Sequence, residues 1–206
     1  MRLVPMSPEA WSEAYQAIIE GDLVVFPTDT VYGVACDPYN PVAIDKLFAA
    51  KGRVREKAIP LLLADARYVR GVSSGLPAAA LRLGQAFWPG ALTLVVPRRA
   101  DLPPNLSAGE TVAVRVPGHV ELQRFLETCS GALAVTSANL SGQPDALTAG
   151  QAADYLGDRV RVVVDGGAVP GGVPSTVVNC TVEPPAVLRE GAIPRDRILE
   201  ALGKLR

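Results

Sequence analysis

Four positively charged side chains fall within seven residues of this chain, at Lys51, Arg53, Arg55 and Lys57. Because like charges repel, a fold that gathers these side chains in one place requires a compensating anion. Arginine offers planar, bidentate contacts to phosphate, and lysine offers a mobile point charge. The cluster therefore fits either a triphosphate site or a solvent-exposed basic loop.

A serine and an asparagine two residues apart, Ser137 and Asn139, form a second candidate group. They follow the apolar run 133–135 and precede Gly142, so a buried strand would deliver them into a glycine-ended loop. Hydroxyl and amide groups, together with exposed backbone N–H donors, suit phosphate oxygens without a Walker loop. A simple strand-to-turn transition is the alternative explanation.

Weaker signals lie at the ends of other apolar runs. Residues 26–33 contain Thr28, Thr30 and Tyr32, whose hydroxyls suit a small polar ligand, although a threonine- and aspartate-stabilised turn has the same composition. Three further polar residues stand at predicted strand ends: Arg115, Ser175 and Arg189. Ligand sites in α/β sheets gather at such ends, so we expect these side chains to converge.

An alternation of helices and buried strands must position these groups. Apolar runs predict strands at residues 23–26, 59–63, 92–96, 112–116, 133–135, 160–164 and 176–178. Capping residues and helical spacing predict helices at residues 8–20, from residue 41, and near 77–86, 119–129, 149–156 and 194–203. This order is typical of a layered α/β domain. Because a loop without helical pattern joins the runs 92–96 and 112–116, we expect a mixed sheet, within one domain over residues 1–206.

Composition and motif content exclude several classes of protein. The chain has 206 residues, of which 49% are hydrophobic and 20% charged, the balance of an ordinary globular protein. Every apolar run is too short to span a bilayer, and the N-terminus lacks a signal-peptide core, so we expect a cytoplasmic protein without membrane contact. A net charge of −1 disfavours nucleic-acid binding through the overall field. Walker, Gly-x-Gly-x-x-Gly and Gly-x-Ser-x-Gly motifs are all absent from the sequence.

Side chains that bind metal ions are scarce. His119 is the only histidine, and its place before a predicted helix indicates a helix-start residue. Cys36, Cys129 and Cys180 are widely spaced and include no Cys-x-x-Cys pair, so they predict neither a disulfide framework nor a zinc site. We therefore expect no metal ion held by protein ligands alone.

Taken in order, the motifs resemble those of the YrdC-like family of L-threonylcarbamoyladenylate synthases. They are Phe-Pro-Thr-Asp-Thr-Val-Tyr-Gly from residue 26, Lys-Gly-Arg from 51, Phe-Trp-Pro-Gly-Ala-Leu-Thr from 87, Ala-Val-Arg-Val-Pro from 113, Thr-Ser-Ala-Asn-Leu-Ser-Gly from 136 and Ser-Thr-Val-Val from 175. The resemblance runs from about residue 23 to residue 189 and is to the short branch of the family.

The resemblance implies an open, twisted, mixed α/β sheet flanked by helices, with a positively charged concave face. It implies an enzyme that combines L-threonine, bicarbonate or carbon dioxide, and ATP into threonylcarbamoyl-AMP and pyrophosphate, with Mg²⁺ bound through the phosphates. A separate transferase complex would then pass the threonylcarbamoyl group to adenosine 37 of tRNA. A weak contact with tRNA itself stays open.

Residue roles also follow from the resemblance. The family signature corresponds to Lys51, Arg53, Ser137 and Asn139, which we expect at the catalytic centre. ATP would contact Arg53, Lys57, Thr111, Ser137 and Arg189. Threonine would contact Thr30, Arg115 and Ser175.

The sequence departs from the family pattern at four positions. Leu62 stands where many members carry histidine, Val54 where proline is common, Asp29 in place of glutamate, and Asp145 where a serine often contacts nucleotide. We therefore leave Asp145 outside the predicted site. Two alternative functions stay open: a carbamoyl-adenylate-forming domain like that of hydrogenase-maturation carbamoyltransferases, and a non-catalytic module that binds RNA or tRNA.

Overall fold

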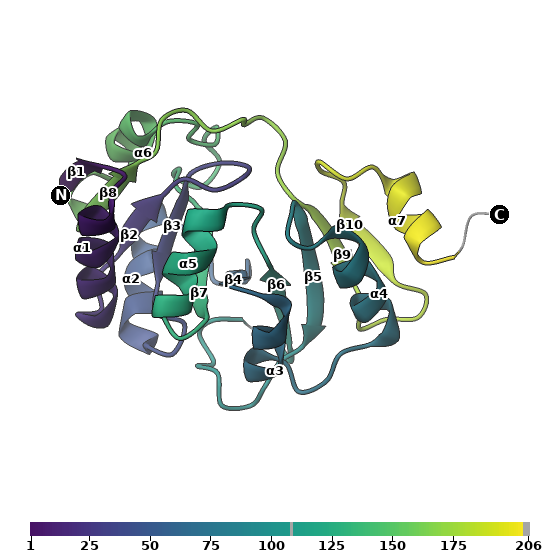
Figure 1. The fold of residues 1–206 in the computed structure, drawn as a ribbon. Coiled ribbons are helices and arrows are strands. Elements are labelled where there is room, and N and C mark those ends of the chain that lie inside the picture. The colour runs from purple at the N-terminus through teal and green to yellow at the C-terminus, as the bar shows by residue number, and fades with distance from the viewer. Residues whose placement is uncertain (108, 204–206) are drawn as a thin grey trace.

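The computed structural model describes residues 1–107 and 109–203, and the strands in these residues form one ten-stranded sheet (Figure 1). The strand order is β1-β8-β2-β3-β7-β4-β6-β5-β9-β10. The strands are β1 Arg2–Pro5, β2 Val24–Phe26, β3 Gly33–Cys36, β4 Leu61–Leu63, β5 Leu92–Pro97, β6 Thr111–Arg115, β7 Ala132–Ser137, β8 Val162–Asp165, β9 Thr176–Asn179 and β10 Ala186–Arg189.

The sheet is mixed, as predicted. Four neighbouring pairs are parallel (β1/β8, β2/β8, β4/β6 and β5/β9) and five are antiparallel (β2/β3, β3/β7, β4/β7, β5/β6 and β9/β10). An antiparallel pair, unlike a parallel pair, needs no crossover helix between its two strands. A loop between β5 and β6 can therefore join them as an antiparallel pair. β7 inserts between β3 and β4, so segments far apart in the sequence become neighbours at the centre of the sheet.

Helices cover both faces of the sheet (Figure 1). They are α1 Pro8–Ile19, α2 Pro41–Lys51, α3 Val69–Val72, α4 Ala78–Phe87, α5 Val120–Thr128, α6 Ala149–Leu156 and α7 Arg195–Ala201, with 3₁₀ turns at Ala66–Tyr68 and Gly157–Arg159. One apolar core contains side chains of α2, α4 and α6, and the other contains those of α1 and α5. β2 is wholly buried, as expected for a strand covered on both faces.

Local sequence explains how α2 is bounded. The side chain of Asn40 caps its first turn by accepting hydrogen bonds from the backbone N–H groups of Val42 and Ala43, and proline occupies the first helical position. Gly52 ends the helix in the left-handed conformation, with φ 58°, which a residue with a Cβ adopts at a cost. This ending leaves Lys51 in the last helical turn and directs the chain at Arg53 away from the helix axis.

Each predicted strand and helix is present, with boundaries shifted by one or two residues at some ends. His119 is the N-cap of α5, as predicted, because its Nδ1 accepts a hydrogen bond from the N–H of Leu122 (3.2 Å). Three strands, β1, β3 and β10, were not predicted from the sequence. β1 and β10 are short edge strands with exposed residues, and β3 has only three apolar residues after Gly33, so the apolar run of each is short. The described residues contain no helix long and apolar enough to cross a membrane.

Residues 166–175 connect β8 to β9 across much of the width of the sheet (Figure 1). The fully buried Tyr32 anchors the start of this connection, since its hydroxyl donates to the Gly167 carbonyl (2.6 Å) and accepts from the Gly166 N–H (3.2 Å). At the other end, the Pro174 carbonyl accepts a hydrogen bond from the Ala192 N–H (2.9 Å). The connection is therefore tied down at both ends.

A Gly191→Ala substitution tests the turn beside this connection. A Cβ at Gly191 would lie 2.2 Å from the Pro174 carbonyl oxygen and 2.6 Å from the Ser175 carbonyl carbon. We expect overpacking against this backbone to lower the free energy of unfolding by about 2–3 kcal/mol, measured by urea denaturation. Gly75→Ala is the matched control, because a Cβ there meets no atom within 4 Å. Equal stability of the two variants would contradict the prediction.

Candidate active site

A cavity of about 200 Å³ lies over the centre of the sheet, where the polar ends of several strands meet. It is lined by Thr28, Thr30, Val31, Gly33, Arg53, Pro60, Leu62, Thr93, Arg115, Val135, Thr136, Ser137, Asp145, Pro174, Ser175 and Arg189. Larger hollows of about 750 and 630 Å³ elsewhere on the surface contain none of the predicted site residues. We therefore assign the candidate active site to the smaller cavity.

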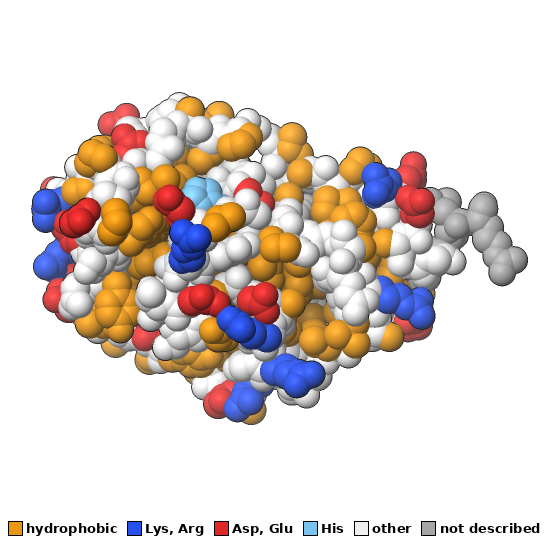
Figure 2. Space-filling model, in the orientation of Figure 1, with side chains coloured by type: hydrophobic (Ala, Val, Ile, Leu, Met, Phe, Trp, Pro, Cys, Tyr) orange, Lys and Arg blue, Asp and Glu red, His pale blue; other side chains and the backbone are white. Residues whose placement is uncertain are grey.

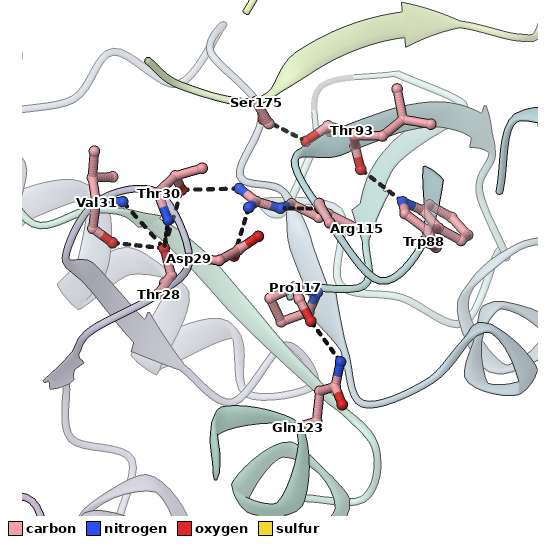
Figure 3. A network of polar contacts seen from close by, with 12 residues as sticks. Thr28, Asp29, Thr30, Val31, Trp88, Thr93, Arg115, Pro117, Gln123 and Ser175 are labelled. Carbon is pink, nitrogen blue, oxygen red and sulfur yellow. Dashed lines mark hydrogen bonds and ion pairs between the residues drawn. The ribbon is translucent and has the colours of Figure 1, made fainter. Parts of the chain in front are cut away.

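Arg115 ends β6 and is the most constrained cation of the cavity (Figure 3). Its side chain is nearly buried, and its Nη2 pairs with Asp29 Oδ1 at 2.6 Å. Nε donates to the Gly90 carbonyl (2.9 Å) and Nη1 to Thr30 Oγ1 (3.1 Å). Because guanidinium has five N–H groups, two are left for a ligand. Arg115 thus holds the 28–31 turn in place and still faces the cavity.

The 28–31 turn is also stabilised from within (Figure 3). Thr28 Oγ1 donates to the Val31 carbonyl (2.7 Å) and accepts from the N–H groups of Thr30 and Val31 (3.1 and 3.2 Å). The threonine-stabilised turn that the sequence offered as an alternative is therefore real. It coexists with a ligand-facing role, since Thr28 and Thr30 both line the cavity.

Arg189 and Ser175 form a second polar chain at the opposite wall. Arg189 donates from Nη2 and Nε to the Ser175 carbonyl (2.8 and 3.2 Å), and Ser175 Oγ lies 2.8 Å from Thr93 Oγ1. Burial and the nearby positive charge of Arg115 lower the pKa of Arg189, whereas Asp145 opposes this shift. Asp145 and Arg115 are therefore both close enough to Arg189 to act on its charge.

Arg53 lies just beyond the end of α2 and reaches the cavity from a third direction. Its Nε and Nη2 donate to the carbonyls of Lys57 and Ala58 (2.9 and 2.8 Å), which fixes the guanidinium without neutralising it. Burial lowers the pKa of Arg53, and an arginine remains charged at neutral pH despite such a shift.

Lys51, Ser137 and Asn139 converge in one hydrogen-bond network. The Lys51 ammonium donates to the carbonyls of Ser137 and Asn139 and to Asn139 Oδ1. Ser137 Oγ donates to the same Oδ1 (2.6 Å), and Asn139 Nδ2 donates to the Gln143 carbonyl (2.5 Å). Of these three residues only Ser137 lines the cavity, so Lys51 and Asn139 lie behind its wall.

The structure brings most, but not all, of the predicted site residues to the cavity. The lining residues are Thr30, Arg53, Arg115, Ser137, Ser175 and Arg189. Lys57 is outside the lining, and its side chain is exposed. Thr111 is also outside, at the opposite end of β6 from Arg115, which corresponds to about 13 Å along the strand.

Several lining residues were not predicted. Thr93 and Thr136 carry hydroxyls inside the predicted motifs, and this composition was the available signal. Thr28, a candidate from its sequence motif, also lines the cavity. Asp145 was left out of the predicted site, yet it lines the cavity. Leu62 also lines it, so the departure from histidine makes one wall apolar.

The electrostatic character of the cavity follows from its lining. Three guanidinium groups face one carboxylate, Asp145, and Asp29 offsets the charge of Arg115 from the side. No ion pair or hydrogen bond joins the Asp145 side chain to a described residue. The cavity therefore suits a ligand that carries more negative than positive charge.

Comparisons with known proteins agree with this picture. The Sua5/YciO/YrdC family model, described as "Telomere recombination", matches residues 16–191. Threonylcarbamoyl-AMP synthase of Pyrococcus abyssi is 36% identical over 190 residues, covering 92% of this chain and 56% of that protein. A putative threonylcarbamoyl-AMP synthase of Mycobacterium tuberculosis is 42% identical over 194 residues, covering 92% of this chain and 88% of that protein.

Similarity extends to solved structures. The crystal structure of P. abyssi Sua5 complexed with L-threonine matches with a TM-score of 0.91 at 35% identity, covering 99% of this chain and 61% of that chain. The fold and cavity define an α/β protein with an arginine-lined cavity over the centre of a mixed sheet. The chain belongs to the Sua5/YciO/YrdC family. It spans little more than half the length of the curated P. abyssi relative.

An Asp145→Asn substitution tests the charge balance of the cavity. Removing the carboxylate leaves the guanidinium groups of Arg53 and Arg189 unopposed and that of Arg115 offset only by Asp29, so pyrophosphate should bind about threefold tighter at low ionic strength, measured by calorimetry. The gain should fade with added salt, which screens charges. Asp154→Asn makes the same charge change at an exposed position outside the cavity and should leave binding unchanged. Weaker binding by Asp145→Asn would contradict the prediction and show that this carboxylate contacts the ligand.

Proposed function

We propose that this chain is an L-threonylcarbamoyladenylate synthase, which converts L-threonine, bicarbonate or carbon dioxide, and ATP into threonylcarbamoyl-AMP and pyrophosphate. The observation that carries the proposal is the convergence of three arginines with the hydroxyls of Thr30, Ser137 and Ser175 in one cavity. The P. abyssi and M. tuberculosis relatives are named for this activity, and their alignments cover most of this chain, which supports the same assignment.

The chemistry matches the side chains available. The threonine amine adds to carbon dioxide and loses a proton, which gives a carbamate. A carbamate oxygen then bonds to the α-phosphorus of ATP, the bond from that phosphorus to the bridging oxygen breaks, and pyrophosphate leaves with the electron pair. Negative charge builds on phosphate oxygens, so fixed cations contribute most to such a step. A protein with a single histidine is therefore suited to it.

The residues divide into two groups under this proposal. Arg53 and Arg189 would hold the phosphates and Ser137 another part of ATP, while Thr30, Arg115 and Ser175 would hold threonine, with the two remaining N–H groups of Arg115 on its carboxylate. Ligands of drug size fill sites of about 300–1,000 Å³, so ATP would extend beyond a cavity of about 200 Å³. Lys57 and Thr111, outside the lining, would contact that outer part of the nucleotide.

Magnesium would enter with the triphosphate as part of the substrate. Mg²⁺ prefers six oxygen ligands and usually retains several waters. The cavity offers one unpaired carboxylate, Asp145, and the described residues contain no cluster of three or more metal-binding side chains. Phosphate oxygens and water would therefore supply most of the ligands of the ion.

The product would serve a separate transferase complex that modifies adenosine 37 of tRNA. Direct RNA binding without catalysis is the less favoured alternative, because the net charge is −1 and the face shown in Figure 2 mixes basic and acidic side chains. A carbamoyl-adenylate-forming domain is a second alternative, since it shares the adenylation step and differs in the amino substrate.

Pyrophosphate release separates these functions. The protein should release pyrophosphate from Mg²⁺-ATP only when L-threonine and bicarbonate are both present. Release that persists without threonine but requires carbamoyl phosphate would favour the carbamoyl-adenylate alternative. Absence of release from folded protein that binds tRNA, with an affinity that falls steeply with salt, would favour RNA binding.

Arg53→Gln is the sharpest test of the assigned phosphate contact. We expect pyrophosphate release to fall by about 10²-fold or more, because a fixed cation that opposes developing phosphate charge is lost. Arg55→Gln is the matched control, since Arg55 is exposed, pairs with Asp45 at 2.8 Å and lies outside the cavity lining. This control should retain activity within about twofold. Equal losses in both variants would show that the basic cluster acts only as a diffuse field.

A further inference from the structure

The Lys51 ammonium has no free hydrogen with which to bind a ligand. It lies at the end of α2 with an exposed fraction of 2%. Its three acceptors are the Ser137 carbonyl, the Asn139 carbonyl (2.5 Å) and Asn139 Oδ1 (3.0 Å). Because a lysine ammonium carries three N–H groups, these contacts use all of them.

Asn139 is equally committed, and the identities of its partners determine the orientation of its amide. Oδ1 faces the Lys51 cation, and Nδ2 faces the Gln143 carbonyl oxygen. A flipped amide would place an NH₂ group against an ammonium and an oxygen against a carbonyl, two repulsive contacts. The charge of Lys51 therefore specifies which atom of Asn139 lies beside Ser137.

The Ser137 hydroxyl is oriented as a consequence. Its nearest side-chain partner is Asn139 Oδ1 at 2.6 Å, an atom that only accepts hydrogen bonds, so Ser137 must donate its hydrogen there. Ser137 lines the cavity, whereas Lys51 and Asn139 do not. Its oxygen thus presents lone pairs to the cavity and takes a hydrogen bond from a donor on the ligand, such as the N–H of a carbamate, a ribose hydroxyl or a bound water.

We infer that Lys51 and Asn139 are positioning residues, which act behind the cavity wall by holding the Ser137 hydroxyl as a hydrogen-bond acceptor toward the substrate. This inference rests on the proposed function for its turnover assay. It differs from a role in which Lys51 contacts phosphate directly. The backbone contributes to the same unit, since the Ser141 N–H donates to the Lys51 carbonyl (3.0 Å).

A double-mutant cycle distinguishes the two roles of Lys51. Lys51→Met retains the length of the side chain and removes its charge, and Ser137→Ala removes the hydroxyl that Lys51 is inferred to orient. Residues that act as one unit give strongly non-additive losses. We expect Lys51→Met to reduce pyrophosphate release by about 10²-fold in the wild-type background and by less than about tenfold in Ser137→Ala. Equal fold-losses in both backgrounds would overturn the inference.

The pH dependence of activity separates a loss of the Lys51 charge from a loss of folded structure. Burial lowers the pKa of Lys51 to about 8, the positive charge of Arg53 acts in the same direction, and Asp145 opposes both. Above this pH a neutral amine has two N–H groups for three acceptors. The activity ratio of wild type to Lys51→Met should therefore fall by about tenfold or more between pH 7 and pH 9.5. A constant ratio would overturn the inference.

Binding measurements keep this test separate from the proposed function. Calorimetry with Mg²⁺-ATP on the same variants should show the non-additive pattern whether or not pyrophosphate is released. A wild-type protein that binds ATP but releases no pyrophosphate would contradict the synthase assignment alone. An additive cycle in both turnover and ATP binding would contradict the positioning role alone. Lys46→Met is the matched control for Lys51→Met, because Lys46 is an exposed lysine of α2 that lies outside the cavity.

Discussion

The site depends on holding cations in place without neutralising them. Arg53, Arg189 and Lys51 are each oriented by main-chain carbonyl oxygens, which accept hydrogen bonds but carry no net charge. Only Arg115 is paired with a carboxylate, that of Asp29. Carbonyl dipoles thus specify where the positive charge lies and leave it available to a ligand. An equal number of acidic partners would have ordered the same side chains and cancelled the field that attracts an anion.

This arrangement has an energetic cost that the fold must offset. Several positive groups close together repel one another, and burial further disfavours their charged forms, as the lowered pKa of Lys51 indicates. Burial of two apolar cores, one on each face of the sheet, stabilises the fold and offsets this electrostatic cost. A bound anion relieves the repulsion, so ligand binding and folding stability are linked.

Sheet topology explains why motifs scattered along the chain act together. β7 lies between β3 and β4, which places the end bearing Ser137 opposite Gly33 at the start of β3. β6 pairs with β4 in parallel and delivers Arg115 beside Leu62. β9 and β10 close the far side with Ser175 and Arg189. The order in sequence therefore differs from the order in space, and only the latter defines the cavity.

Much of this protein could be predicted from local sequence, because helix caps, apolar runs and turn residues act over a few positions. These signals located the start of α2 and most of the strands, and the family resemblance indicated the charged residues that surround the site. The edge strands β1 and β10 were not predicted, because they bury too few side chains to require a long apolar run. Asp145 was left out of the predicted site because it stands where the resembling family often has a serine, and its proximity to Arg189 arises only through the packing of distant segments.

The amino-acid sequence by itself determined which residues carry charge, where helices begin and end, and that a mixed α/β sheet would form. Only the tertiary structure decided the direction in which each polar group points. Lys51 shows the reason: its partners lie 86 and 88 positions further along the chain, and they direct its ammonium behind the cavity wall. A hydrogen bond depends on distance and angle between atoms, and for segments so far apart both are set by packing of the whole sheet.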